Sequence, residues 1–426
     1  MTQSKSNMAK NLIIGFQHVL AMFGATVLVP MLTGLDVSLS LLCAGLGTLL
    51  FHLVTKGKVP TFLGSSFAFI SAVQIVAMRK AGLSVLPENL IANTAYQAAL
   101  PYATGGIVVA GAVYLVMAAI VYFIGTEKFL KLFPPIVTGT MIIIIGLMLA
   151  PTAINSITQG GTVTGVPLLK NWFVAGIAIA TIVCISLFTK GFFKLVPILF
   201  GIFVSYMFAL MFGMVDFSLI NNIKFLQVPK IMLPKFDLSS ILIIAPISIV
   251  TFVEHIGDVT ASSAVVGKNF MRDPGLHRTL IGDGAATMLA GFLGGPANTT
   301  YSENTSVLAT TKNYNPATLR IAAVIAILLA FLGKFAGIIQ TLPGAVIGGV
   351  SIVLYGMISA VGLRNLVENK VDFKQSRNLY IAAVMLVIGL GGATINFSET
   401  VSLSGVALSA ILGIILNLIL PNIEEQ

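Results

Sequence analysis

Charged side chains are scarce in this sequence. Only 9% of its 426 residues are Asp, Glu, Lys or Arg, whereas 57% are hydrophobic, and the mean hydropathy is +0.99. A soluble core does not need that much apolar sequence, but runs of about 20 apolar residues match the thickness of a bilayer core. The 15 acidic residues fall mostly between such runs or at their ends. This composition excludes a soluble globular protein and predicts a polytopic, all-α membrane protein.

Cysteine is nearly absent as well. Cys43 and Cys184 both lie inside apolar segments, where cysteine acts as a small core residue, so we expect neither a disulfide nor a metal site.

The sequence also lacks a small-residue cleavage site after its first apolar run, which continues to about Leu32. We therefore interpret this run as a retained first span and not as a signal peptide.

The basic residues form no stripe and no pattern with stacking aromatic residues. The net charge of +9 thus does not indicate a nucleic-acid partner. Lys and Arg are scattered singly through loops, mostly on the side of the N-terminus, as the positive-inside rule expects for cytoplasmic loops. We predict that both termini are cytoplasmic.

Fourteen hydrophobic segments follow one another along the chain, and two of them are interrupted. The third begins at Pro60 and contains the sequence GSSFAF (64–69), and the tenth contains NTTYSEN (298–304). The predicted segments are 11–33, 37–54, 60–78, 104–124, 130–151, 171–189, 195–215, 239–262, 279–295, 298–312, 316–335, 340–361, 378–394 and 402–420.

An internal repeat relates the two interrupted segments. Gln17-His18 matches Glu254-His255 at an offset of 237 residues, and the same offset carries Ser66 onto Glu303. Seven segments in each half would make the second half inverted relative to the first. Interrupted spans at equivalent positions of inverted repeats mark the binding site of many transporters.

Broken spans leave backbone groups unpaired in an apolar medium, which is tolerated only against protein or a polar cavity. Because residues Ser65–Phe69 and Thr299–Tyr301 have strand-like character, we predict that they cross near the midplane and pair as a short two-stranded element. The half-helices that follow would present their amide ends to the cavity. Ser66 and Tyr301, in these two segments, are candidate substrate-binding residues.

Four acidic residues lie in or beside apolar segments, where an ionisable group is costly and usually faces a cavity. Glu254 and Asp258 are four residues apart and share a helix face. Two like charges this close repel, so one of them is expected to carry a proton. Asp258 could instead be a helix-end residue that faces cytoplasmic water, and Glu303 could lie in an exposed loop. Asp283 fits either a supporting partner of the site or an acid on a proton path.

The remaining polar residues favour binding over catalysis. His18 is expected to hydrogen-bond a neighbouring helix, and His255 lacks the spacing of a zinc protease. No nucleophile–base pattern is present, which argues against an enzyme. The ring of Phe67, at the tip of a broken helix, could stack on a flat ligand. Carboxylates accept from N–H groups and amides donate to carbonyls, so a nucleobase suits this set whereas a simple anion does not.

Six motifs carry a resemblance to a known family. The chain resembles the nucleobase–cation symporters, also called nucleobase–ascorbate transporters, and within them most closely the members that transport uracil. The resemblance covers nearly the whole chain. The motifs are QHVLAMFGATVLVP (17–30), PTFLGSSFAFIS (60–71), VEHIGD (253–258), RDPGLHR (272–278), PANTTYSEN (296–304) and VDFKQSRNL (371–379).

The resemblance implies fourteen spans in two inverted repeats of seven. It divides the chain into a core domain, residues 1–126 and 239–336, and a gate domain, residues 127–238 and 337–426. The gate domain is also the usual homodimer surface of the family. The resemblance further implies no cofactor, a nucleobase and a proton as the transported partners, and a bacterial inner or plasma membrane as the location.

The same resemblance assigns roles to individual residues. Glu254 and Glu303 match the two carboxylates that hydrogen-bond the base. Phe67 matches a residue that contributes a backbone contact and ring packing, and Ser302 matches a position that contributes a backbone amide. Asp258 matches the proton-coupling position, to which we add Glu303 and Asp283 as candidates.

The chain also departs from the family pattern. Some uracil members have His where this chain has Asp258, which puts the pH range of coupling in doubt, and Ser302 and Ser306 stand where Gly is common. Purine-transporting members usually have Gln in place of Glu303, so Glu303 favours uracil, whereas Asp283 resembles an acid of the purine members. We expect a proton-coupled uracil importer. The alternatives are a xanthine or uric acid symporter of the same family and an anion exchanger or channel on the related fold.

Overall fold

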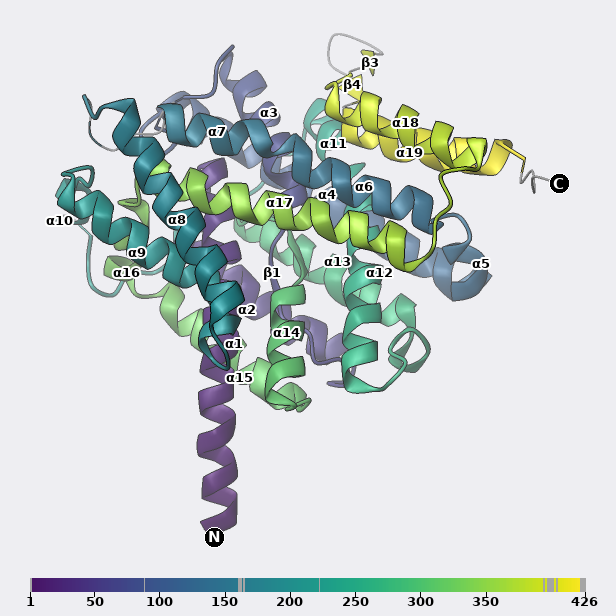
Figure 1. Ribbon diagram of the computed structural model, residues 1–426, viewed down its shortest axis with the longest axis horizontal. Helices are drawn as coiled ribbons and strands as arrows, with labels where there is room; N and C mark the ends of the chain where they lie inside the picture. Colours follow the sequence, from purple (N-terminus) through teal and green to yellow (C-terminus); the bar gives the residue numbers. More distant parts are fainter. Residues whose placement is uncertain are drawn as a thin grey trace.

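The computed structural model describes residues 2–87, 89–159, 163, 165–221, 223–393, 395–396, 402–403 and 405–421, and it is built mainly of helices (Figure 1). The first α-helix projects from the body of the molecule at its N-terminal end. The α-helices are α1 (Thr2–Thr33), α2 (Val37–Val54), α3 (Ile70–Ala81), α4 (Thr94–Ile124), α5 (Thr126–Leu130), α6 (Pro135–Met148), α7 (Ala150–Gln159), α8 (Leu168–Phe188), α9 (Pro197–Met211), α10 (Ser218–Asn221), α11 (Leu238–Ile244), α12 (Ile247–Val266), α13 (Leu276–Leu293), α14 (Ser302–Thr311), α15 (Pro316–Ala330), α16 (Gly333–Gln340), α17 (Gly344–Glu368), α18 (Ser376–Leu390) and α19 (Gly405–Ile419).

Short elements join these helices. They are the strands β1 (Leu63–Ser65), β2 (Asn298–Thr300), β3 (Ile395–Asn396) and β4 (Ser402–Leu403), the 3-10 helices η1 (Phe67–Phe69) and η2 (Phe193–Leu195), and the π-helical turn η3 (Met271–Gly275). The strands form two separate antiparallel pairs, β1 with β2 and β3 with β4.

Several of the helices can cross a membrane. Within the described residues, seven are long and apolar enough to do so by length and composition. They are Lys10–Thr33, Val37–Val54, Thr94–Ile124, Pro135–Gln159, Leu168–Phe188, Leu238–Val266 and Gly344–Glu368. Each predicted apolar segment overlaps at least one helix. The expectation of a multi-pass helical membrane protein is confirmed at this level.

Local sequence explains where many of these helices begin. Asp36 caps α2 by accepting a 2.7 Å hydrogen bond from the amide of Leu39, and Asn93 caps α4 at 2.9 Å from the amide of Tyr96. Such caps satisfy amides that the first turn leaves unpaired. Proline stands at the start of α6, α9 and α15, where its missing N–H costs nothing.

Asp237 both caps α11 and joins it to α3. Its carboxylate lies 2.8 Å from the ammonium of Lys80 and accepts a 3.1 Å hydrogen bond from the amide of Ser240. The Lys80 ammonium, followed by the Ser239 hydroxyl, holds the pKa of Asp237 well below its usual range. Asp237 is therefore ionised at neutral pH and fixes the start of the segment that leads into α12.

The helices pack as two sets. In one set, α13 packs on α4 and α2, and α15 packs on α2 and α1; in the other, α17 packs on α6, α7 and α8. Small residues permit the closest approaches, as is common for membrane helices. A Cβ on Gly111 of α4 would lie 2.6 Å from the carbonyl oxygen of Gly284 on α13, and a Cβ on Gly362 of α17 would lie 2.6 Å from that of Gly139 on α6.

Candidate functional site

The two interrupted segments cross and pair. Strand β1 runs antiparallel to β2 with Leu63 opposite Thr300 and Ser65 opposite Asn298, and every residue of both strands is buried. This pairing satisfies backbone groups that would otherwise be unpaired in an apolar medium. A two-stranded element between the two interrupted segments is confirmed, but its strands are Leu63–Ser65 and Asn298–Thr300, whereas we predicted residues 65–69 and 299–301. Residues 67–69 form η1 instead of a strand.

Polar side chains from neighbouring helices hold the crossing in place. Thr48 of α2 accepts a 2.9 Å hydrogen bond from the amide of Leu63. The side-chain amide of Asn298 donates to the carbonyl of Cys43 at 3.0 Å, and Thr287 of α13 donates to the carbonyl of Asn298 at 2.9 Å. Both strands are thus anchored to α2 and α13.

Tyr301 connects the two segments through a hydrogen bond and through packing of its ring. Its hydroxyl donates a 2.9 Å hydrogen bond to the carbonyl of Ser65, and its ring covers Gly64, where a Cβ would lie 2.4 Å from the ring carbons. The backbone amide of Tyr301 donates to Phe62 at 3.0 Å, and that of Ser66 donates to Ala297 at 2.8 Å. Both amides are therefore engaged inside the crossing. Backbone amides that are free to donate to the carbonyl oxygens of a ligand must lie elsewhere.

The first turn of α14 supplies them. This helix begins at Ser302, directly after β2, and its N-cap residue Tyr301 provides no side-chain capping bond. The initial N–H groups of a helix have no partner within the helix and favour negative charge or carbonyl oxygen. Ser302 is exposed, so this helix end is accessible. Ser66 offers a different group: its hydroxyl is buried and has no hydrogen-bond partner among the described residues.

Three carboxylates gather beside this helix end. Glu254 and Asp258 lie on α12, which packs against α14, and Glu303 lies in the first turn of α14. Glu254 interacts electrostatically with Glu303, and Asp258 with both. All three are surrounded by protein yet partly exposed, so none of them is sealed in the core. The structure thus brings together residues separated by some fifty positions in the sequence.

Asp258 has a specific partner that sequence reasoning missed. The hydroxyl of Thr300, at the end of β2, donates a 2.7 Å hydrogen bond to its carboxylate. This bond connects α12 to the crossing of the two broken segments. Only the polar character of the Asn298–Asn304 segment hinted at such a partner.

Phe67 lies at the start of η1 and is partly exposed. Its ring meets the ring of Tyr355 on α17 edge-on, with centroids 6.0 Å apart. Phe67 therefore stands where the broken segment faces the second set of helices. A ring in this position can also pack on a flat ligand.

Asp283 pairs with His255 behind the site. Its carboxylate lies 2.9 Å from Nδ1 of His255, and neither side chain has any exposed surface. The ring of Tyr114 packs edge-on against His255, with centroids 6.5 Å apart. Asp283 also interacts electrostatically with Glu254, the residue next to His255. The pair thus connects α13 to the part of α12 that carries the candidate binding carboxylate.

His18 hydrogen-bonds a neighbouring helix, as predicted. The side-chain amide of Asn304 lies 3.1 Å from Nδ1 of His18 and 3.0 Å from its carbonyl oxygen. This contact fixes α14 against α1. Within the part of the chain that the structure describes, no group of three His, Cys, Asp or Glu side chains could hold a metal ion.

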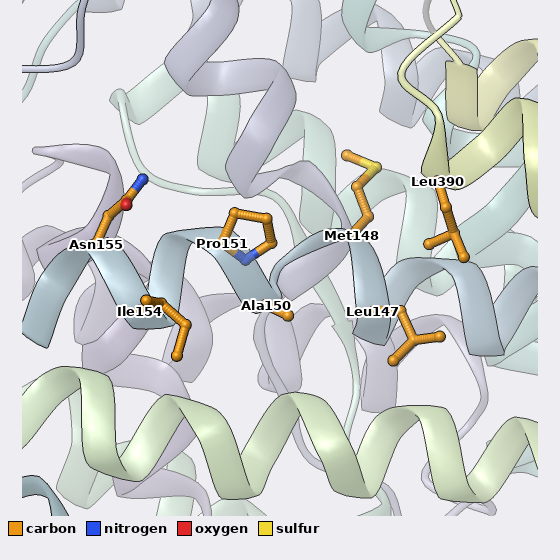
Figure 2. Close-up of a pocket in the computed structure, with 7 residues that line it drawn as sticks. All are labelled: Leu147, Met148, Ala150, Pro151, Ile154, Asn155 and Leu390. Carbon is orange, nitrogen blue, oxygen red and sulfur yellow. The ribbon is translucent and has the colours of Figure 1, made fainter.

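A separate depression lies away from these residues. Figure 2 shows it along α6 and α7, where Asn155 is the one polar side chain among its lining residues. Its volume is about 540 Å3. Because it contains none of the carboxylates, it is not part of the candidate site.

Comparison with known proteins shows which family the chain belongs to. A family model described as "Permease family" matches residues 9–397. The uracil permease of Bacillus caldolyticus is 43% identical over 425 residues, covering 98% of this chain and 94% of its own length. The uracil permease of Bacillus subtilis is 42% identical (96% and 92% covered), and that of Escherichia coli K12 is 39% identical (95% and 90% covered).

Solved structures share the fold at low sequence identity. The transmembrane domain of the cyanobacterial bicarbonate transporter BicA superposes with a TM-score of 0.64 at 15% identity, covering 96% of this chain and 97% of that one. The anion transporter SLC26A9 superposes with a TM-score of 0.69 at 11% identity, covering 96% of this chain and 64% of that one.

The family match and the relatives, together with the apolar helices, identify a multi-pass membrane transporter and not an enzyme. The chain belongs to the nucleobase–ascorbate transporter family.

Proposed function

We propose that the protein is a proton-coupled uracil importer of a bacterial cytoplasmic membrane. The observation that carries the proposal is the meeting of Glu254 and Glu303 beside the uncapped start of α14, in a chain 39–43% identical to uracil permeases. Two neighbouring carboxylates suit a ligand with N–H donors on its edge.

Uracil would bind in the plane between the two carboxylates. Its N–H groups donate to Glu254 and Glu303, and its carbonyl oxygens accept from the first-turn amides of α14 at Ser302. The ring of Phe67 packs on the base. Each of these contacts uses a group that the described residues leave available or partly exposed.

Proton coupling would act through Asp258 and Glu303, with Asp283 behind them. Closing a site around several carboxylates is costly while they are charged. A proton taken up from outside lowers that cost, so the occluded state forms with uracil and proton together. The hydrogen bond from Thr300 supports this role of Asp258, because it connects the acid to the segment that holds the base.

The transport movement would occur between the core domain (1–126 and 239–336) and the gate domain (127–238 and 337–426). The two sets of packed helices support this division, and so does the ring contact between Phe67 and Tyr355 across it. We further propose fourteen spans in two inverted repeats, cytoplasmic termini, and a homodimer through the gate domain.

Two other functions remain alternatives. A xanthine or uric acid symporter is favoured by the buried Asp283, which resembles an acid of purine-transporting members. An anion exchanger on the related fold is disfavoured, because three carboxylates beside the helix end would repel an anionic substrate.

The test is uptake of labelled uracil into proteoliposomes with an inward proton gradient. We expect accumulation that an uncoupler abolishes and that excess unlabelled xanthine leaves unchanged. Loss of uptake in Glu254→Gln but not in Glu127→Gln, a change at an exposed acid of α5, would attribute it to the site. Strong displacement of uracil by xanthine would instead identify a purine transporter.

A further inference from the structure

A polar recess opens at one end of the molecule, and its lining includes none of Glu254, Asp258 and Glu303. Its volume is about 760 Å3, within the range of ligand pockets (about 300–1,000 Å3). It is formed where α2 and α12 end and α15 begins, and in Figure 1 α14 and α15 lie at the end from which α1 projects. The polar side chains in its lining are Lys58, Lys268, Asn269, Arg272, Asp273 and Tyr314.

The charges of this recess do not balance. Both carboxylate oxygens of Asp273 bind the ammonium of Lys58, at 2.5 and 2.7 Å. The side chains of Lys268 and Arg272 are exposed and have no ion pair or side-chain hydrogen bond among the described residues. Two positive charges therefore remain available in the wall of one concave site.

The uncharged groups also point to an anion. The side-chain oxygen of Asn269 accepts from the backbone amide of Arg272 at 3.2 Å, which leaves the N–H groups of that side chain as donors. The Tyr314 hydroxyl is a further donor, and Tyr314 is partly exposed, at 37%. A guanidinium, an ammonium and neutral donors around one volume match the oxygens of a phosphate group.

We propose that this recess binds a phosphate group, carried by an anionic membrane lipid or by a soluble phosphate ester. Scattered cations at span ends are expected from topology alone. Here, however, two cations without an ion pair in the described part of the chain, Lys268 and Arg272, line a single cavity. The carboxylate of Asp273 in that cavity is already paired with Lys58, from a segment more than 200 positions away. Basic pockets between helix ends are a recurrent way of holding lipid headgroups.

The test compares two phosphate sources on purified full-length protein in detergent. One arm titrates dioleoylphosphatidylglycerol, with zwitterionic dioleoylphosphatidylcholine, whose choline cation balances its phosphate, as the reference, and counts bound lipid by native mass spectrometry. The other arm titrates inorganic pyrophosphate by calorimetry. The pocket variant is Lys268→Ala with Arg272→Ala, and the control is Lys190→Ala with Lys194→Ala, which removes the same charge from an exposed loop outside the recess.

We expect the pocket variant to bind the phosphate probe about tenfold or more weakly while the control binds as the wild type does. Binding of phosphatidylglycerol alone would identify a lipid site, and binding of pyrophosphate would identify a site for soluble phosphate. Equal binding by pocket variant, control and wild type in both arms would overturn the proposal, as would the absence of any binding.

Folding of the variants is checked separately. Uracil binding should be unchanged in both, since neither pair belongs to the carboxylate site. If the double pocket variant does not fold, the single change Arg272→Gln replaces it, with the same expected direction. The result does not depend on the proposed uracil transport, because the readout is binding of the phosphate probe.

Discussion

The hydroxyl of Thr300 donates a 2.7 Å hydrogen bond to the carboxylate of Asp258 and so joins β2 to α12. One end of this bond lies in the crossing of the two broken segments, and the other lies one helical turn from Glu254. A change in the charge of Asp258 would therefore alter a hydrogen bond to the segment that leads into α14.

Asp258→Asn should reduce proton-driven uracil accumulation far more than uracil counterflow, because the amide cannot take up and release the proton. Thr300→Val should reduce the ratio of accumulation to counterflow about tenfold, since a hydrogen bond to a charged group contributes about 1.5–3 kcal/mol. Both rates are measured in the same proteoliposomes. Thr310→Val, at an exposed position of α14, is the control. An unchanged ratio in Asp258→Asn would count against its role in coupling.

Glu254→Gln and Glu303→Ala should each weaken uracil binding by about a hundredfold or more, because each removes a charged acceptor from the plane of the base. Calorimetry in detergent measures the binding directly. Glu127→Gln and Glu368→Gln change exposed acids outside the site and should bind uracil as the wild type does. Wild-type affinity in either site variant would contradict the assignment.

The crossing could be predicted from sequence because the signals that carry it are local. Polar and small residues interrupt two apolar segments, which a single offset of 237 residues relates to each other. A helical period of 3.6 residues places Glu254 and Asp258 on one face of their helix. The position of β1 could not be predicted, since the strand lies at Leu63–Ser65 and residues 67–69, which we expected in the strand, begin a helix.

The contacts between side chains within the site could be identified only from the structure. Thr300 with Asp258, Asn304 with His18 and His255 with Asp283 join elements whose relative position depends on the packing of α1, α12, α13 and α14. No local sequence pattern predicts these contacts. The sequence shows that the acids lie in or beside apolar segments, but the tertiary packing determines which neighbour each acid has.

Gly64→Ala should destabilise the protein by about 1–3 kcal/mol, because the added methyl group would lie 2.4 Å from the ring carbons of Tyr301 and force the crossing apart. Thermal unfolding in detergent measures the loss, and uracil binding should weaken with it. Gly176→Ala on α8 adds the same methyl group where no heavy atom lies within 4 Å, so it should leave both properties unchanged. Equal stability of the two variants would show that Tyr301 does not pack tightly on Gly64.

His255 and Asp283 should stabilise the protein as a pair. His255→Leu leaves a buried carboxyl group without its partner and should cost about 3–5 kcal/mol, whereas Asp283→Leu leaves the ring without its partner and should cost about 1–3 kcal/mol. The double variant replaces both by apolar side chains, so its loss should be smaller than the sum of the single losses by about 1 kcal/mol or more. Thermal unfolding of the four proteins in detergent completes this cycle.

The control for this cycle combines His255→Leu with Glu127→Gln, a distant change on α5 that should add to within about 0.5 kcal/mol. Additivity in the His255–Asp283 cycle would mean that the 2.9 Å contact contributes nothing to stability. Uracil binding separates the remaining possibilities. Because Glu254 adjoins His255 on α12, loss of the pair should weaken uracil binding even in the stable double variant. That result would assign the pair to positioning the binding carboxylate as well as to folding.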